Sequence, residues 1–417
     1  MAQLIADSFA FGSDLLSVDA ATALVAERVS AVAGIDHVSL EQADGRVLTE
    51  EIVAPIDIPP FDNSAVDGFA VRFSDLASDA GTTLAVEGRA VAGAAPAAPI
   101  ARGRAVRIFT GAPMPEGADT VYMQEDCRIG EGVVTVPPGL KQGANRRPRG
   151  EDVAHGAIAL AAGRRLTPED VGLLAALGLP DVPVRRRLKA AVFSTGDEVA
   201  SPGEPLPSSG IYDSNRFMLN ALLARLAVEV TDLGILPDDR VTVTAALSAA
   251  SSAHDLIVTS GGVSTGDEDH VRAAVEAIGS LVFWRLAIKP GRPVAMGVIA
   301  GTPFVGLPGN PVAVFVTFAY LVRPLVDALA GATRTHVLAL PVIADFSYLK
   351  KAGRREYVRV SLQRSEDGRT LARKHPRDGA GVISSLTETD GLVELREEVT
   401  SVAPGDTVGF FPYAVLR

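Results

Sequence analysis

A glycine-rich segment, TSGGVSTGDED at 259–269, combines an anion cradle with a run of acids. Gly261, Gly262 and Ser264 lie where a predicted strand passes into a helix, and glycines there let backbone N–H groups approach a bound anion. The carboxylates that follow, ending at Asp269, would repel a phosphate unless a hard cation such as Mg²⁺ lies between them. Acids in the first turn of a helix also gain ~0.3–1 kcal/mol from its dipole. We favour a site for an anion and Mg²⁺ over this simpler explanation.

Two further turns place polar groups after predicted strands. The turn FSTGDE ends at Glu198, where a ligand would meet the strand end, although a plain polar turn explains it equally well. In YDSN, Ser214 and Asn215 are good helix caps, and capping is a sufficient account of them. Together with Asp213, the same groups also suit a nucleotide base or ribose.

The segments LAIKPGRP and GLPGNP complete the polar set in the second half of the chain. Lys289 and Arg292 lie in a turn stiffened by glycine and proline, which lowers the entropic cost of holding cations at one place. This arrangement suits a phosphate or an oxyanion. In GLPGNP a second helix begins, with Asn310 as its cap and proline in its first turn. The ligand-facing candidates of this segment are Pro308, Gly309 and Asn310.

The first half of the chain carries its own polar segments. PPFDNSAVDGF contains Asp62 and a second aspartate five residues later, which is more than a turn requires. RIFTGAPMP places Thr110 at a strand end, and NRRPRGED combines three arginines with an acidic pair that ends at Asp152. Each segment has a local structural explanation, but together they predict a second half-site that handles an anion.

The elements that must position these residues follow from hydrophobic periodicity. Residues 188–329 alternate strands with amphipathic helices, which predicts a mostly parallel sheet covered on both faces. In such sheets ligands bind at the carboxyl ends of the strands. Residues 47–138 consist of short β-branched runs separated by glycine and proline and predict a β-rich module. Helices are predicted over 16–32 and 164–178, and short strands from about residue 336.

Composition limits the function classes. Lys and Arg number 39 against 50 Asp and Glu, a net charge of −11, so the counterion release that drives nucleic-acid binding is not expected. The single cysteine, Cys127, allows neither an intrachain disulfide nor a thiolate metal cluster. The start of the chain does not read as a signal peptide. The most apolar stretch, 311–322, is shorter than the ~20 residues of a membrane span. We therefore expect a cytoplasmic protein with no membrane or nucleic-acid partner.

Eight collinear segments resemble the successive motifs of the MoeA and gephyrin E-domain family. They are PPFDNSAVDGFAV, RIFTGAPMPEGADTVYMQED, NRRPRGEDV, FSTGDEV, YDSN, TSGGVSTGDEDH, LAIKPGRPVAMG and GLPGNPVAVF, and they cover nearly the whole chain. The resemblance implies an α/β multidomain protein with a three-layer, MogA-like molybdopterin-binding domain. The implied divisions are a helical domain from 1–46 and 147–185, a β-rich insertion at 47–146, the α/β domain at 186–330 and a C-terminal β-barrel at 331–417.

The resemblance also implies a reaction: molybdate and adenylylated molybdopterin react with the help of Mg²⁺, AMP leaves, and molybdenum cofactor results. A homodimer is implied, whose site joins the α/β domain of one protomer to the N-terminal domains of the other. Other cofactor-biosynthesis proteins and apo-molybdoenzymes are further implied partners. The implied catalytic residues are Asp62, Asp269, Glu198, Thr110 and Lys289, with Asp62 and Asp269 at the metal. The implied substrate-binding residues are Gly261, Gly262, Ser264, Asp213, Ser214, Asn215, Arg292, Pro308, Gly309, Asn310, Asp152, Asp238 and Arg359.

The sequence departs from the family pattern at three places. Arginine stands at positions 285 and 292, where the family often has lysine, and Ala380 stands where a serine is expected. Two other functions remain alternatives. An adenylyltransferase that makes the adenylylated pterin shares the α/β domain, but the acidic motif of the N-terminal half argues against it. A non-catalytic scaffold of the same fold is the other alternative, and nothing in the sequence resembles an added receptor-binding region.

Overall fold

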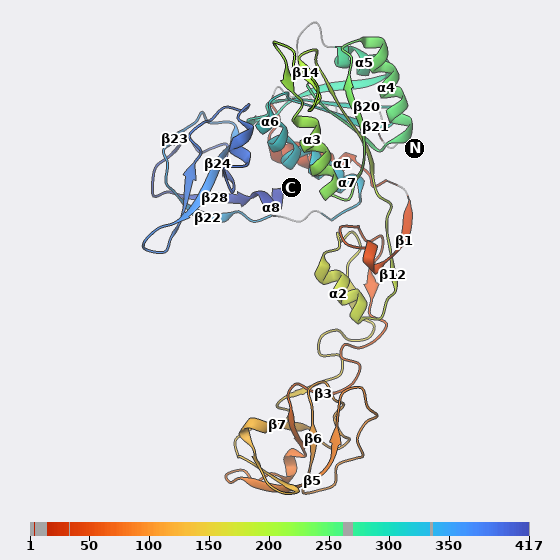
Figure 1. Ribbon diagram of the computed structural model, residues 1–417, viewed down its shortest axis with the longest axis vertical. Helices are drawn as coiled ribbons and strands as arrows, with labels where there is room; N and C mark the ends of the chain where they lie inside the picture. Colours follow the sequence, from red (N-terminus) through yellow and green to blue (C-terminus); the bar gives the residue numbers. More distant parts are fainter. Residues whose placement is uncertain (1–3, 5–14, 33, 262–269, 334–336, 417) are drawn as a thin grey trace. The chain divides into compact units, whose positions relative to one another are not determined.

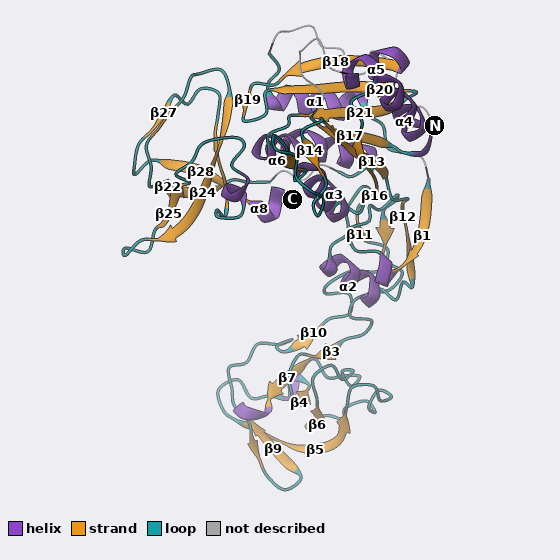
Figure 2. Cartoon of the chain, turned by 45° about the horizontal axis from the view of Figure 1, so that its top comes forward, coloured by secondary structure: helices purple, strands orange, loops and turns teal. Residues whose placement is uncertain are grey.

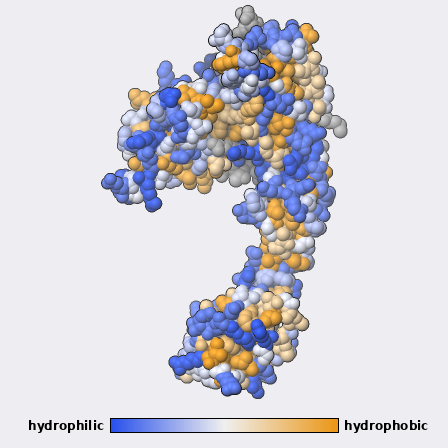
Figure 3. Space-filling view, in the orientation of Figure 1, coloured by the Kyte–Doolittle hydropathy of each residue, from blue (hydrophilic) through white to orange (hydrophobic). Residues whose placement is uncertain are grey.

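The computed structural model of this 417-residue chain describes residue 4 and residues 15–32, 34–261, 270–333 and 337–416. The chain forms two compact units (Figure 1). Unit 1 comprises 1–49, 163–167 and 182–417, and unit 2 comprises 50–162 and 168–181. On the face visible in Figure 3, hydrophobic residues are scattered in small groups among hydrophilic ones, as is usual for protein surfaces.

A six-stranded sheet forms the centre of unit 1, in the order β16-β13-β17-β21-β20-β18. The first four strands are parallel, whereas β20 and β18 run antiparallel to their neighbours. This confirms the predicted, mostly parallel sheet. The strands are β13 (Lys189–Thr195), β16 (Glu229–Leu236), β17 (Leu256–Ser260), β18 (Gly279–Arg285), β20 (Pro293–Ile299) and β21 (Thr302–Leu307).

Helices cover both faces of this sheet, because its buried strands are apolar on both sides. Ala190 and Val192 of β13 pack into one hydrophobic cluster, whereas Ala191 and Phe193 pack into another. The first cluster includes residues of α1, α3, α6 and α7, and the second those of α4 and α5. These helices are α1 (Val18–Arg28), α3 (Asn215–Arg225), α4 (Arg240–Ala253), α5 (His270–Ile278), α6 (Pro311–Thr317) and α7 (Arg323–Leu329). The three-layer α/β fold is therefore confirmed.

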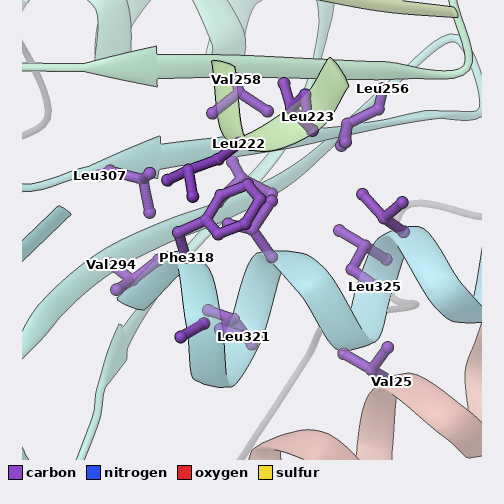
Figure 4. Packing of buried hydrophobic residues seen from close by; sticks show 14 of the residues in the cluster. Val25, Leu222, Leu223, Leu256, Val258, Val294, Leu307, Phe318, Leu321 and Leu325 are labelled. Carbon is purple, nitrogen blue, oxygen red and sulfur yellow. The ribbon is translucent and has the colours of Figure 1, made fainter. Parts of the chain in front are cut away.

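Phe318 lies at the centre of the larger cluster, fully buried among Leu222, Leu307 and Leu321 (Figure 4). Burying a side chain of this size stabilises the fold by ~1.5–3 kcal/mol. Phe318 begins a π-helical segment, Phe318–Val322, between α6 and α7. Pro324 follows directly; it has no N–H to donate to the preceding turn and its ring crowds that turn, so a local widening relieves both conflicts.

The continuous helical stretch Pro311–Leu329 is 19 residues long, longer than the apolar run predicted from the sequence. By length and composition alone it would cross a membrane, but 72% of its most apolar window is buried inside the protein. A central core helix accounts for its hydrophobicity, since it is surrounded by other apolar elements of unit 1.

Five strands near the C-terminus close into a barrel, because β24 pairs with both β25 and β26 while β25-β22-β28-β26 complete the circuit. The strands are β22 (Leu340–Ala344), β24 (Arg355–Arg364), β25 (Thr370–Lys374), β26 (Gly391–Leu395) and β28 (Thr407–Pro412). The predicted C-terminal barrel is confirmed. A short strand, β19 (Ile288–Lys289), joins it in parallel beside β24. The chain therefore passes from the sheet to the barrel within a few residues, because β18 ends at Arg285 and β19 begins at Ile288.

Unit 2 contains a second six-stranded sheet, in the order β7-β4-β6-β5-β9-β8, which confirms the predicted β-rich module (Figure 2). Its strands are β4 (Gly68–Val71), β5 (Thr82–Ala90), β6 (Arg104–Ile108), β7 (Thr120–Met123), β8 (Arg128–Ile129) and β9 (Val133–Val136). The short strands and remaining helices of the chain are β1 (Ile35–Ser39), β2 (Ile52–Val53), β3 (Asn63–Ser64), β10 (Arg146–Arg147), β11 (Ile158–Leu160), α2 (Pro168–Ala176), β12 (Asp181–Arg185), β14 (Val199–Ala200), β15 (Ile211–Tyr212), β23 (Tyr348–Leu349), β27 (Ser401–Val402) and α8 (Tyr413–Leu416).

The two predicted N-terminal helices form where expected. Ser17 caps α1, since its side chain accepts a hydrogen bond from the Ala20 N–H at 3.1 Å. Helix α2 begins at Pro168, in the first helical position. Contacts assign α1 to unit 1, where it packs on α7, and α2 to unit 2. The division into four domains stays a prediction.

Candidate functional site

The carboxyl ends of β13, β17 and β21 meet at one edge of the unit 1 sheet. After β13 the chain forms β16 on one side and then returns as β17 on the other, so the strand order reverses between β13 and β17. Ligands of open α/β sheets bind at such a point. Gly196 and Gly261 follow these two strands, and Pro308 follows β21. The edge therefore gathers three of the segments singled out in the sequence.

Asn215, at the start of α3, ties this edge together. Its Nδ2 donates to the Ser260 Oγ at 2.8 Å and to the Gly309 carbonyl at 2.7 Å. The predicted capping by Ser214 and Asn215 is wrong, because Ser214 makes no side-chain cap bond and Asp213 instead accepts from the Arg216 N–H at 3.1 Å. Asn215 is thereby free to bridge the loops after β17 and β21.

Several buried polar atoms at the same edge lack a hydrogen-bond partner among the residues that the structure describes. They are Ser194 Oγ, Thr195 Oγ1, Thr259 Oγ1 and Asn215 Oδ1. An unpaired polar group is costly in a protein interior, and most such groups have a partner. A ring of neutral donors and acceptors fits a heterocyclic, hydrogen-bonding ligand. The adjoining residues 262–269, with the predicted site residues Gly262, Ser264 and Asp269, lie outside the described part of the chain.

Asp213 is buried and already engaged by a neighbour. The Arg216 Nε donates to its Oδ2 at 2.8 Å, and the Arg216 Nη1 donates to Asp232 at 2.5 Å. Burial opposes ionisation of Asp232, but the hydrogen bonds from Arg216, the Gly234 N–H and Asn220, together with the Arg216 charge, outweigh it and lower the Asp232 pKa. This network anchors the start of α3 to β16 and so holds Asn215 in place.

The other predicted residues of unit 1 near this edge are exposed. The exposed residues are Glu198, Asp238, Arg292, Gly309 and Asn310. Gly196 has φ +132°, and a Cβ there would lie 2.6 Å from the Glu198 carboxylate, so glycine is required at this turn. Asn310 precedes α6 as predicted but makes no side-chain cap bond.

A separate cavity of about 120 Å³ lies where β19 joins the barrel. Its lining includes Lys289, Tyr348, Arg359, His375 and Ala380. Pockets for drug-sized ligands measure ~300–1,000 Å³, so this cavity suits a small ion. Two cations predicted from separate motifs are thus brought to one place.

Arg359 is 6% exposed and donates to the carbonyls of Gly379 and Arg377 at 3.1 and 3.0 Å. Within the described residues it has no ion pair with a carboxylate. Burial lowers its pKa, which expresses the cost of desolvating the charge. Asp378 also lines the cavity and its charge favours the Arg359 guanidinium, but its carboxylate forms an ion pair with Lys374 at 2.6 Å. Buried charges are ordinarily paired, so a buried guanidinium that has no ion pair of its own favours an anion site in the cavity.

Lys289 approaches the same cavity from β19. Its Nζ lies 3.0 Å from the Glu356 carboxylate and 3.3 Å from the Tyr348 hydroxyl. Burial alone would lower the Lys289 pKa, but the hydrogen bonds to Glu356 and Tyr348 outweigh it and raise the pKa. Lys289 is therefore a firmly charged cation. Gly291, with φ +110°, makes the tight turn after it.

Unit 2 holds the acidic and basic residues of the first half of the chain. Asp62 accepts from the Arg149 N–H at 2.7 Å and forms an ion pair with Arg146 at 2.7 Å. Asp67 accepts from both the N–H and the hydroxyl of Thr110, at 2.8 and 2.7 Å, and these bonds lower its pKa. The predicted residue Asp152 is exposed. Nothing in the described residues forms a cluster of three or more potential metal-ligating side chains.

Cys127 has no catalytic thiolate character. Burial raises the pKa of its thiol to about 11, with the neighbouring Asp126 adding to the effect. The thiol is thus protonated at neutral pH, which agrees with the absence of a nucleophilic role in the sequence interpretation.

Sequence reasoning missed Tyr348, His375 and Glu356, which complete the cavity and its wall. Tyr348 and Glu356 belong to different strands of the barrel region, and Glu356 faces Lys289 only through the register of β19 with β24. In the sequence, Glu356 lies within the run RREYVRV, and nothing in the neighbouring residues distinguishes it from an exposed, solvated carboxylate.

Three family models match consecutive parts of the chain. They describe the MoeA N-terminal region (domains I and II) at 16–178, a probable molybdopterin-binding domain at 191–328, and the MoeA C-terminal region (domain IV) at 341–413. Along the chain they correspond in turn to the region of the unit 2 sheet, the α/β region and the barrel described above.

Named relatives match along the full length. A molybdopterin molybdenumtransferase of Haemophilus influenzae is 40% identical, over 96% of this chain and 99% of its own. A molybdopterin molybdenumtransferase 2 of Mycobacterium tuberculosis is 36% identical, over 92% of this chain and 96% of its own. The crystal structure of a molybdopterin biosynthesis MoeA protein from Pyrococcus horikoshii is 30% identical, with a TM-score of 0.80 over 96% of this chain and 100% of that one.

The fold and the site thus define a multidomain protein with an α/β molybdopterin-binding region. The chain belongs to the MoeA family.

Proposed function

We propose that this protein inserts molybdenum into adenylylated molybdopterin, with release of AMP. The relatives at 40% and 36% identity bear the name molybdopterin molybdenumtransferase, and this chain matches them from end to end. The protein is accordingly a transferase of molybdenum-cofactor biosynthesis, and the release of AMP is the finer step that we add.

The observation that carries this proposal is a cavity lined by Lys289 and by Arg359, which is buried and has no ion pair among the described residues. Molybdate is a small tetrahedral dianion, and two cations with the Tyr348 hydroxyl supply charge and hydrogen bonds of matching kind. A bound oxyanion would neutralise the charge of the Arg359 guanidinium and so offset the free energy lost when that charge is buried. The size of the cavity favours molybdate over the much larger pterin.

The edge of the unit 1 sheet is the proposed binding place for the adenylylated pterin. Its unpaired buried hydroxyls and the Asn215 Oδ1 match the many donors and acceptors of a pterin ring. The turns at Gly261 and Gly309 let backbone groups approach a phosphate closely. Glu198, Asp213, Ser214, Pro308, Asn310, Asp238 and Arg292, together with Gly262 and Ser264, stay proposed members of this site.

The chemistry is breakage of a phosphoanhydride and transfer of an oxyanion, so it needs charge neutralisation more than a protein nucleophile. Lys289 and Arg359 hold negative charge on the oxyanion in the cavity. The backbone N–H groups of the glycine turns hold the phosphates. The protonated thiol of Cys127 agrees with a reaction that uses no covalent intermediate on the chain.

Magnesium, the homodimer and a cytoplasmic location are further parts of the proposal. Mg²⁺ would neutralise phosphate charge when bound, and Asp62 and Asp269 are its proposed ligands. As it stands, Asp62 does not offer an open cation site, because the Arg146 guanidinium occupies one of its oxygens. No catalytic step is therefore assigned through the metal. Thr110 and Asp152 are proposed to complete the site from unit 2 of the partner protomer in the homodimer.

The test is a single-turnover assay of the full chain with adenylylated molybdopterin. We expect AMP, quantified by chromatography, to appear only when molybdate is added. The proposal would be refuted if AMP were released equally with and without molybdate, or if no AMP were released. Consumption of ATP with unadenylylated pterin would instead identify an adenylyltransferase, and cofactor-pathway binding without turnover would identify a scaffold.

A further inference from the structure

Glu356 is a buried carboxylate that contacts the cavity residues without lining the cavity. Its side chain is 1% exposed. Its Oε2 accepts hydrogen bonds from the Lys289 ammonium at 3.0 Å and from the Tyr348 hydroxyl at 2.8 Å. The backbone enforces this meeting, because Lys289 and Glu356 are register partners of β19 and β24. Glu356 therefore acts on the cavity through these two side chains.

The hydrogen-bond inventory leaves Lys289 one free donor. An ammonium has three N–H groups and a phenol has one O–H. The Tyr348 hydroxyl gives its proton to Glu356 and accepts from Lys289 at 3.3 Å. Two of the three Lys289 donors are thus held by Glu356 and Tyr348. The third has no acceptor among the described residues and lies on a side chain that lines the cavity.

The charge balance around Glu356 remains positive. Arg354 Nε also donates to Glu356, through Oε1 at 3.2 Å. One carboxylate thus faces two cations, Lys289 and Arg354, so it holds Lys289 in place without cancelling the charge presented to an anion. Because Lys289 is 47% exposed on a flexible four-carbon stem, its head would otherwise sample several positions.

We propose that Glu356, with Tyr348, is a positioning residue that directs the free N–H of Lys289 into the cavity and so fixes where the oxyanion binds. This inference rests on the proposed function, because it takes molybdate as the ligand of the cavity. The inference adds Glu356 and Tyr348 to the proposed site as residues that contact Lys289, which remains the cation that binds the oxyanion.

Two physical effects of Glu356→Gln have opposite signs, which makes the proposal testable. Removing a negative charge near the cavity strengthens attraction for an anion. Removing the charge-assisted bonds releases the Lys289 head and weakens binding. If positioning dominates, affinity falls; if Glu356 is only a nearby charge, affinity rises. The amide conserves volume, so packing around the site is retained.

The decisive experiment is calorimetric titration of the full-length protein with sodium molybdate. We expect Glu356→Gln to bind about tenfold more weakly than the parent and Tyr348→Phe about threefold more weakly, with Glu356→Asp in between. Asp345→Asn is the matched control, since Asp345 is a barrel carboxylate that pairs with the exposed Arg373. Equal or tighter binding by Glu356→Gln overturns the proposal. If that variant does not fold, parent-like binding by Tyr348→Phe overturns it.

Molybdate binding measured over a range of pH distinguishes a positioning role of Glu356 from a merely structural role, which would leave the pH dependence unchanged. The charged or titratable groups around the Lys289 head are Glu356, Arg354, Tyr348, Arg359, His375 and Asp378. The Glu356 carboxylate helps hold Lys289 protonated, so in Glu356→Gln the loss of molybdate binding at alkaline pH moves down by about one pH unit. An unmoved alkaline limit contradicts the proposal.

These measurements separate the two levels of inference. A parent protein that binds molybdate with the expected order of variants but releases no AMP refutes the proposed function and leaves the positioning role of Glu356 intact. A parent that turns over adenylylated pterin but shows no molybdate binding at millimolar concentration refutes the positioning role alone.

Discussion

Arginines in the two units have opposite environments. In unit 2 the three arginines of NRRPRGED each pair with a carboxylate: Arg146 with Asp62, Arg147 with Glu151, and Arg149 with Asp57. All three are at least one third exposed. In unit 1, Arg359 is buried and has no carboxylate partner within the described residues. A dense basic motif is thus internally neutralised, whereas one isolated arginine retains its charge beside a cavity. We therefore base the proposed anion site on burial and pairing rather than on the number of arginines.

The strongest test of this comparison is Arg359→Gln. Removing a preorganised cation from the proposed transition-state environment is expected to lower molybdate-dependent AMP release by about 100-fold or more. Single-turnover assays measure the effect. Arg373→Gln, which removes an exposed barrel arginine, serves as the control and should retain parent activity. Comparable losses in both variants would show that general barrel integrity, not the cavity, controls the rate.

Asp62→Asn tests the unit 2 cluster. We expect turnover to fall by about 10- to 100-fold, because the carboxylate is a proposed part of the catalytic site, while molybdate binding by calorimetry stays at the parent value. The exposed ion pair with Arg146 contributes less than ~1 kcal/mol, so the fold should survive. Parent-like AMP release would show that Asp62 is only a structural partner of Arg146 and Arg149. In that case the charged cluster of unit 2 would have no part in turnover, in contrast to Arg359 of unit 1.

A partly buried ion pair that is held by two hydrogen bonds should matter more to stability than the exposed pairs of unit 2. Arg186 binds Asp255 through two bonds, at 2.8 and 2.6 Å. We expect Asp255→Asn to lower the free energy of unfolding by about 2 kcal/mol at pH 7. Glu151→Gln, which breaks the half-exposed pair with Arg147, should cost less than ~0.5 kcal/mol. Urea denaturation of the two variants measures the difference, and equal costs would contradict it.

The Asp255 effect should depend on pH with a definite sign. Burial raises the Asp255 pKa, but hydrogen bonds from Arg186 and the Lys189 N–H outweigh it, and the folded-state pKa is lowered. The stabilisation is therefore complete above the unfolded pKa of ~3.9. It is lost as pH falls through the folded value, so parent and Asp255→Asn should converge in stability toward pH 3.

The smallest expected effect concerns Ala380, which lines the cavity where the family pattern has a serine. Ala380→Ser adds one neutral hydroxyl that can donate to the oxyanion, so affinity for molybdate should increase about threefold. Calorimetry measures it directly. Weaker binding would show that the added group crowds the oxyanion instead of donating to it.

Much of the fold was accessible from the sequence because the signals are local. The apolar stripes of α3 and α4, the continuous apolar run of β13 and the capping of α1 by Ser17 all depend on residues within a few positions of one another. The helix that begins at residue 215 was also indicated by its caps, but the predicted caps Ser214 and Asn215 are wrong, because Asp213 accepts the hydrogen bond from the Arg216 N–H. Asn215 turns away from capping because loops after residues 260 and 308 offer it stronger partners.

The sequence by itself determined the α/β class, the β-rich module, the short C-terminal strands and the polar segments at the strand ends, since periodicity and turn chemistry encode them over short distances. The closure of the C-terminal strands into a barrel was implied only by the family resemblance, because it depends on the pairing of β24 with β26. Only the tertiary structure decided which charges remain available. Lys289 and Glu356 are 67 residues apart and meet through strand register, whereas the arginines of NRRPRGED are neutralised by partners up to 92 residues away. Pairing and desolvation depend on distances in space, so no local pattern could separate Arg359 from the surface arginines.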